Sequence, residues 1–218
     1  MLKAKIMNQL QFFETKKPNK IDNLIIFLHG FGANGQDLLS LAPYFQDKQK
    51  NCHFIAPNAP YKTEMHNSFF WFPLHNTEET ELNKEINKTI PILENFINSC
   101  KEKYQIDNSK IILFGFSQGA ALAIHHGISA KSAYKAILSF SGGALAKIKE
   151  SKKNNAPICL IHGLNDAVLP AKTSIDTADI FSEIEHPHQI KLINNLAHNI
   201  NLEGLEFACD FLDNLSNK

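Results

Sequence analysis

Short apolar blocks alternate along the chain with longer segments whose apolar residues recur at helical spacing. Most of the blocks are continuous runs of four or five residues, which is typical of parallel strands buried on both faces. Six such strands are predicted, at 24–28, 53–56, 111–114, 136–140, 158–161 and 190–193. The N-terminal sequence KIMNQLQFF adds an expected antiparallel edge strand.

Helices are predicted between these strands, at 36–45, within 78–104, and at 118–129, 173–185 and 202–215. Pro91 is expected to start a second helical piece or to kink the long helix, because proline lacks the backbone N–H. The alternation predicts an α/β fold with a mostly parallel, doubly wound sheet flanked by helices. The 218 residues suit one domain over 1–218. The lysine-rich segment 147–155 is expected to be a solvated surface loop.

The composition argues against nucleic acid as a partner. Lys plus Arg and Asp plus Glu are each 22, so the net charge is zero, whereas domains that bind nucleic acid usually carry a basic surplus. Every basic residue is a lysine, so no arginine fork can clamp a carboxylate or a phosphate. Apolar runs are too short for a signal-peptide core or a membrane span. A cytoplasmic location without stable membrane insertion is therefore expected.

No metal site and no cofactor are predicted. The four cysteines lie far apart without a C-x-x-C pair, a pattern that indicates single buried thiols rather than a disulfide or zinc framework. His125 and His126 are adjacent on a predicted helix, so both cannot face one ion.

The sequence GFSQG at 115–119 marks a candidate nucleophile. It joins the predicted strand at 111–114 directly to the predicted helix at 118–129, and Gly115 and Gly119 flank Ser117 at minus two and plus two. At so sharp a turn a Cβ on either flank would collide with the other backbone. This G-x-S-x-G arrangement between strand and helix is a nucleophile elbow. A serine hydroxyl is a weak nucleophile near pH 7, so a base and an acid are required elsewhere.

Asp166 is the candidate acid. Ligands of open α/β sheets bind beyond the carboxyl ends of the strands, and the sequence ICLIHGLND runs from a strand straight into Asp166. Asp176 and Asp179 fall within a predicted helix and are interpreted as its polar face.

His198 is the candidate base. Three histidines follow Asp166, but His186 and His188 precede the last strand and should lie at its amino end. His198 follows that strand after a short loop. The order Ser, Asp, His is that of the α/β-hydrolases, in which the histidine is the general base and the aspartate fixes its tautomer.

The loop LHGFGANGQDL at 28–38 is the candidate oxyanion loop. Two backbone donors are needed for the tetrahedral oxyanion, one next to the nucleophile and one from the loop after an early strand. The N–H groups of Gln118 and Phe31 are the predicted donors. The aromatic segment NSFFWFPL, which contains Trp71 and Phe72, is either core or the wall of an acyl pocket, and Leu164 is a further candidate for that pocket.

Together these motifs resemble the phospholipase/carboxylesterase family of α/β-hydrolases, which includes the acyl-protein thioesterases. The matching stretches are FLHGFGANGQDL, APNAP, WF, GFSQGAA, HGLNDAVLP and AHNI, in family order from residue 26 onward. The resemblance implies a serine esterase or thioesterase with Ser117, Asp166 and His198 as the triad. It also implies that the N–H groups of Phe31 and Gln118 form the oxyanion hole.

The sequence departs from the family pattern at places that bear on the substrate. Ala120 stands where a second glycine is usual, Pro73 replaces the acid of a WFD motif, and Leu164 replaces the aspartate of HGD. The segment between FSGGALAK and APICLIHG is also shorter than in the acyl-protein thioesterases. The departures leave the triad intact and put the acyl pocket in question.

The sequence therefore predicts a cytoplasmic serine carboxylesterase that forms an acyl-enzyme. Its implied substrates are small-molecule or lipid acyl esters, with short acyl esters, lysophospholipids, acyl thioesters and acylated proteins all left open, and a homodimer is also left open. One alternative is a peptidase or dienelactone-type hydrolase on the same fold. The other is a binding protein that retains the α/β-hydrolase fold without catalysis.

Overall fold

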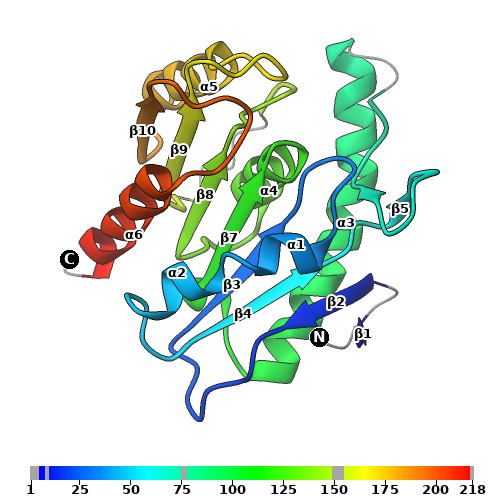
Figure 1. The fold of residues 1–218 in the computed structure, drawn as a ribbon, viewed down its shortest axis with the longest axis vertical. Coiled ribbons are helices and arrows are strands. Elements are labelled where there is room, and N and C mark those ends of the chain that lie inside the picture. Colours follow the sequence, from blue (N-terminus) through cyan, green and yellow to red (C-terminus); the bar gives the residue numbers. More distant parts are fainter. Residues whose placement is uncertain (1–4, 8–9, 75–77, 149–154, 217–218) are drawn as a thin grey trace.

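The fold is that of a computed structural model that describes residues 5–7, 10–74, 78–148 and 155–216. Within these ranges eight strands form one sheet in the order β1-β2-β4-β3-β7-β8-β9-β10 (Figure 1). Their bounds are β1 Lys5–Met7, β2 Leu10–Glu14, β3 Asn23–Leu28, β4 Cys52–Pro57, β7 Ile111–Phe116, β8 Ala136–Phe140, β9 Ile158–Gly163 and β10 His188–Ile193. All six predicted parallel strands are confirmed.

The sheet is parallel from β4 to β10 and antiparallel only at one edge. β2 runs antiparallel to β4, and β1 antiparallel to β2, which confirms the expected N-terminal edge strand. The parallel strands from β4 to β9 in the sheet order are almost continuously buried, as their apolar sequences predicted. The edge strand β10 is mostly half-buried. Their carboxyl ends meet at one edge, where the connecting loops carry the candidate functional residues.

Helices cover both faces of the sheet (Figure 1). Their bounds are α1 Gly35–Leu39, α2 Ala42–Gln46, α3 Glu79–Tyr104, α4 Gln118–Ser129, α5 Lys172–Glu183 and α6 Leu202–Ser216, with a 3₁₀ turn at Asn108–Lys110. Residues of α3, α4 and α5 pack into one core cluster, and residues of α1, α2 and α6 into the cluster on the opposite face. The mostly parallel, doubly wound arrangement agrees with the fold class expected from the sequence.

Two of the predicted helices differ in detail. The helix expected at 36–45 is broken into α1 and α2, because Pro43 lies in the first turn of α2 and cannot donate to the carbonyl of Leu39. The long helix α3, in contrast, runs through Pro91 as one element, so no second helical piece begins there, and a kink at Pro91 stays a prediction. Most of the lysine-rich segment expected to be a surface loop lies outside the described residues.

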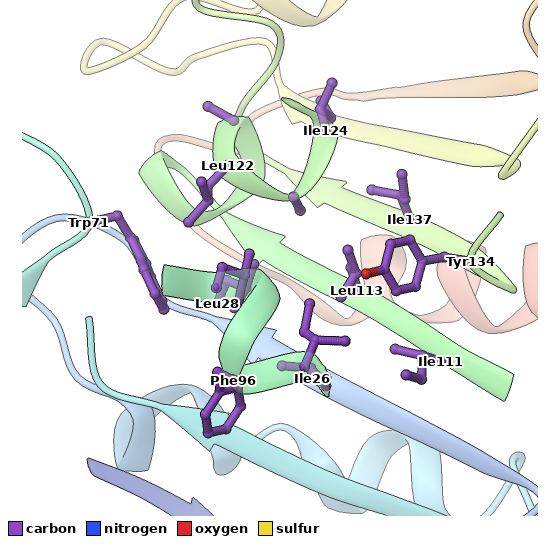
Figure 2. Packing of buried hydrophobic residues seen from close by; sticks show 14 of the residues in the cluster. Ile26, Leu28, Trp71, Phe96, Ile111, Leu113, Leu122, Ile124, Tyr134 and Ile137 are labelled. Atoms are coloured by element: carbon purple, nitrogen blue, oxygen red, sulfur yellow. The ribbon is translucent and has the colours of Figure 1, made fainter. Parts of the chain in front are cut away.

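A short hairpin escaped the sequence analysis. β5 Tyr61–Lys62 pairs with β6 Phe69–Phe70, and Phe69 also bridges to Ala33 in the loop after β3. The chain then enters the core at Trp71 and Phe72, both fully buried. Figure 2 shows Trp71 in the same apolar cluster as Leu28 on β3 and Phe96 on α3. The hairpin is thereby fixed next to the loop that precedes α1.

Candidate active site

Ser117 occupies a strained turn between β7 and α4. Its backbone has φ 54° and ψ −116°, a conformation that costs free energy for any residue other than glycine and that clusters at functional sites. The flanking glycines are required by space. A Cβ on Gly119 would lie 2.0 Å from the carbonyl oxygen of Leu28, and one on Gly115 would lie 2.4 Å from the Cα of Ala120. The structure thus places the serine on the elbow that the motif predicts.

Ser117, His198 and Asp166 come together at the carboxyl edge of the sheet. The Nε2 atom of His198 lies 2.9 Å from Ser117 Oγ, and its Nδ1 atom lies 2.7 Å from Asp166 Oδ2. A carboxylate only accepts hydrogen bonds, so Nδ1 carries the ring proton and Nε2 is free to accept the serine proton. This is the geometry of a nucleophile, a base and a residue that orients the base.

Asp166 is held in its ionised form. Burial by itself would raise the pKa of its carboxyl, but hydrogen bonds from the N–H of Leu169, from His198 and from the N–H of Val168 outweigh burial and keep the pKa below its ordinary value. Both N–H groups reach Oδ1 at 2.9 Å. The turn after β9 therefore fixes one carboxylate oxygen and leaves Oδ2 to face His198.

The loop after β3 lies against the serine. A Cβ on Gly30 would lie 3.3 Å from the Cβ of Ser117. The Nδ1 atom of the buried His29 donates to the Gly30 carbonyl at 2.7 Å, and its Nε2 atom accepts from the Ala59 N–H at 3.0 Å. Because a trans peptide directs its N–H opposite to its carbonyl, the N–H of Phe31 points away from His29. Burial lowers the pKa of His29 to about 4, against a smaller opposing effect of the Gly30 carbonyl, so the ring is neutral near pH 7.

The second predicted oxyanion donor is the first N–H of α4, at Gln118. The first N–H groups of a helix have no acceptor within the helix, and the positive end of the helix dipole favours negative charge there. The geometry is therefore compatible with backbone donors from both Phe31 and Gln118 next to Ser117. Their role in binding an oxyanion stays a prediction.

The candidate pocket residues fall into two groups. Trp71 and Phe72 are fully buried in the core, and the Trp71 ring N–H donates to the His29 carbonyl at 2.9 Å. Leu164, in the turn after β9, is instead 47% exposed. Contact of any of the three with substrate stays a prediction.

The three single-residue departures from the family pattern leave the contacts among Ser117, His198 and Asp166 intact. Ala120 is fully buried. Its methyl group packs against Gly142, where an added Cβ would lie only 2.5 Å away. Pro73 is partly buried beside Phe72. Leu164 lies in the turn that leads to Asp166, and its N–H donates to the carbonyl of Ile193 at 2.9 Å.

The alternative acids and bases lie elsewhere. Asp176 is exposed on α5 and pairs with Lys172, and Asp179 is exposed on the same helix. His186 hydrogen-bonds to the carbonyl of Ala156, immediately before β9, and His188 begins β10. These positions agree with the expectation that His186 and His188 lie at the amino end of the sheet.

His162 contacts the acid and was missed by the sequence analysis. It lies on β9, fully buried, with Nε2 3.1 Å from Asp166 Oδ2. The only sequence signal is a histidine inside an apolar strand, four residues before the acid. Such a residue is more simply interpreted as core, so the contact emerges only from the turn at 163–169.

The other sequence expectations concern thiols, metals and membranes. The four cysteines are free and buried, and burial raises the pKa of Cys209 to about 11 and that of Cys52 to about 12. Among the described residues no group of three or more His, Cys, Asp or Glu side chains could hold a metal ion. No helix in the described ranges is long and apolar enough to cross a membrane.

A parallel sheet covered on both faces, with a serine on a strand–helix elbow and a histidine after the last strand, defines an α/β-hydrolase. The profile of the phospholipase/carboxylesterase family matches residues 11–216. The chain belongs to this family of ester-hydrolysing enzymes. The resemblance found in the sequence motifs is thereby confirmed.

Curated relatives and solved structures agree with this assignment. The chain is 26% identical to acyl-protein thioesterase 1 of Kluyveromyces lactis, over 94% of this chain and 96% of the relative. It is 29% identical to acyl-protein thioesterase 1 of Debaryomyces hansenii, over 94% and 95%. The crystal structure of esterase PE8 superposes with a TM-score of 0.84 at 27% identity, over 94% of this chain and 97% of that one. The carboxylesterase of Bacillus cereus shares the fold, with a TM-score of 0.80 at 16% identity over 94% of both chains.

Proposed function

We propose that this chain is a serine carboxylesterase that acts on short acyl esters or lysophospholipids, and on acyl thioesters, through an acyl-enzyme. The observation that carries the proposal is the hydrogen-bonded series from Ser117 Oγ to His198 and on to Asp166, at 2.9 and 2.7 Å. The similar solved structure of an esterase supports the ester substrates, and the curated relatives named acyl-protein thioesterase 1 support the thioester substrates.

Acylation begins when Ser117 Oγ attacks the carbonyl carbon of the substrate. The proton of Oγ moves to His198 Nε2, and the carbonyl π electrons move onto the oxygen. The N–H groups of Phe31 and Gln118 stabilise this oxyanion. When the tetrahedral intermediate collapses, the bond to the leaving oxygen or sulfur breaks, and His198 donates the proton that it took from Ser117 to the leaving atom.

Deacylation repeats these steps with water in place of the serine. Water attacks the acyl carbon and gives a proton to His198, and collapse releases the carboxylic acid while Ser117 Oγ recovers its proton. Asp166 remains ionised throughout and stabilises the imidazolium that forms twice in the cycle. Neither half-reaction requires a metal or an oxidant.

Exposed apolar side chains beside the triad favour an acyl substrate. Phe31 on the candidate oxyanion loop is 51% exposed, and Val168, two residues after Asp166, is 73% exposed. Leu164 adds a third apolar side chain on the Asp166 side. Burial of such surface against a hydrocarbon chain stabilises the complex by about 25 cal/mol for each Å² removed from water. An acyl ester in the cytoplasm, either a small molecule or a lipidated protein, is the substrate class that fits.

The test combines an active-site probe with a substrate series. A fluorophosphonate should form an adduct on Ser117 in the native protein and none in Ser117→Ala, and p-nitrophenyl esters of graded chain length should be turned over by the wild type alone. An amide and a lactone distinguish the peptidase and dienelactone-type alternatives. A native wild-type protein without a Ser117 adduct would support the binding protein instead.

A further inference from the structure

Asp166 Oδ2 is shared by two histidines. His198 approaches it at 2.7 Å from the loop after β10, and His162 approaches it at 3.1 Å from β9. The other oxygen, Oδ1, accepts the N–H groups of Val168 and Leu169 at 2.9 Å each. A carboxylate can accept about four hydrogen bonds, so the donors saturate it and fix its rotation.

The surroundings of His162 determine which ring nitrogen faces the carboxylate as a donor. Nε2 lies between two acceptors, Asp166 Oδ2 and the carbonyl oxygen of Leu169 at 2.8 Å, so Nε2 must carry a proton. On the other side of the ring, Nδ1 lies 2.7 Å from Ser174 Oγ. Ser174 Oγ also lies within hydrogen-bond distance of the Gly142 carbonyl oxygen, so its single hydroxyl proton is donated either to that carbonyl or to Nδ1. In the described part of the chain, the charged side chain that contacts the rings of both His162 and His198 is Asp166.

We propose that His162 is a positioning residue for catalysis, which acts through Asp166. Its Nε2–H donates a bifurcated hydrogen bond. One acceptor is the Asp166 oxygen that faces His198, and the other is the Leu169 carbonyl oxygen in the turn after β9. The hydrogen bond is charge-assisted and fully buried, which makes it stronger than a neutral bond at the surface. The inference rests on the proposed triad and adds a fourth residue to it.

The consequence for the reaction follows from the active protonation state, an ionised Asp166 beside a neutral His198. A donor on Asp166 stabilises this state against the state in which the pair has taken up a proton. Loss of the donor therefore makes the pair take up a proton more readily, and the acid limb of the pH–rate profile moves to higher pH. The carboxylate also loses one of the bonds that fix its rotation, so the rate on the plateau falls.

Two substitutions at His162 separate the roles of its nitrogens. The amide of glutamine places a donor at the distance of Nε2 from Cβ, whereas the amide of asparagine reaches only the position of Nδ1. His162→Gln thus keeps the donor toward Asp166 and loses the Ser174 contact, and His162→Asn does the opposite. Ser174→Ala is the matched control, because it removes the partner of Nδ1 and leaves Nε2 unchanged.

The measurement is the rate of fluorophosphonate labelling of Ser117 as a function of pH, normalised to the folded fraction. We expect His162→Asn to label about 10- to 100-fold more slowly on the plateau, with the acid limb displaced upward by about 0.5 pH unit or more. His162→Gln and Ser174→Ala should label within about threefold of the wild type, with the limb in place.

Three outcomes would overturn the proposal: an unmoved limb in His162→Asn, equal profiles for the two His162 variants, or a limb that moves in Ser174→Ala. A variant that fails to fold leaves a direct test on the wild type, in which NMR of ¹⁵N-histidine-labelled protein must show a proton on His162 Nε2. A bare Nε2 would refute the inference. Absence of any Ser117 adduct in the wild type would instead refute the proposed function.

Discussion

The side chain of Gln118 accepts a hydrogen bond from the backbone N–H of Trp71 at 2.8 Å and donates one to the Phe72 carbonyl oxygen at 2.6 Å. The residue after the nucleophile thus binds the backbone of a segment 47 residues earlier in the chain. All these groups are buried, so each would be left without a hydrogen bond if the amide were removed. The elbow and the Trp71–Phe72 segment therefore depend on each other.

Gln118→Met should lower the free energy of unfolding by about 2–4 kcal/mol, because it leaves a buried N–H and a buried carbonyl unsatisfied while keeping the side-chain volume. Urea denaturation measures the effect. Gln46→Met, at an exposed position on α2, is the matched control and should change stability by less than about 0.5 kcal/mol. Equal losses in the two variants would show that the Gln118 amide contributes nothing specific.

The glycines of the elbow should be sensitive to a single methyl group. Gly119→Ala should destabilise the protein by more than about 4 kcal/mol, because the new Cβ would lie 2.0 Å from the backbone oxygen of Leu28, which cannot rotate away. Gly204→Ala on α6 is the control, since its Cβ would meet only side-chain atoms, the nearest at 3.1 Å. We expect a change within about 1 kcal/mol there, as helix propensity offsets the tighter packing. A mild effect at Gly119 would contradict the close approach of β3 to α4.

The assignment of Asp166 as the acid can be tested by replacing its carboxylate with an amide of nearly the same shape. Asp166→Asn should lower kcat on p-nitrophenyl esters by about 10⁴-fold, because an amide at that position favours the wrong tautomer of His198. Asp176→Asn, on the exposed face of α5, should leave kcat unchanged within about twofold. The reverse pattern would remove Asp166 from the triad and with it the strand-end argument.

The sequence predicted the sheet because buried parallel strands appear as continuous apolar runs. It also selected the three candidate triad residues, which the structure places within hydrogen-bond distance of one another, because each follows a strand at its carboxyl end. Two details of the fold were predicted incorrectly or missed. The break between α1 and α2 was visible in Pro43, whose effect on the carbonyl of Leu39 was overlooked. The hairpin of β5 and β6 has strands of only two residues, too short for any periodicity to emerge.

The neighbours of the three candidate triad residues were harder to predict than the candidates themselves. His162 lies in an apolar strand and His29 precedes a glycine loop, and neither pattern says what the ring nitrogens contact. Those contacts depend on how the turn at 163–169 and the loop after β3 fold back onto their strands. Hydrogen bonds of this kind arise from tertiary structure, whereas motif spacing reports only the order of residues along the chain.

Three buried histidines make stability depend on pH. Burial lowers the pKa values of His29, His125 and His126 to about 4 each, whereas histidine in an unfolded chain titrates near pH 6.5. Between these values the unfolded chain binds more protons than the folded one, so the free energy of unfolding falls as the pH falls. The stabilisation is complete above about pH 6.5 and is lost progressively toward pH 4. Each histidine contributes a slope of up to about 1.4 kcal/mol per pH unit.

His125→Leu provides the test, because the His125 Nε2 atom is buried without a hydrogen-bond partner and leucine loses no bond there. Urea denaturation of this variant between pH 7 and pH 5 should show a slope smaller than that of the wild type by the contribution of one group, about 1.4 kcal/mol per pH unit at most. Ile128→Val on the same helix is the control, since it should cost about 1 kcal/mol at every pH without changing the slope. A His125→Leu protein whose stability falls with pH as steeply as that of the wild type would show that folding does not lower the pKa of His125.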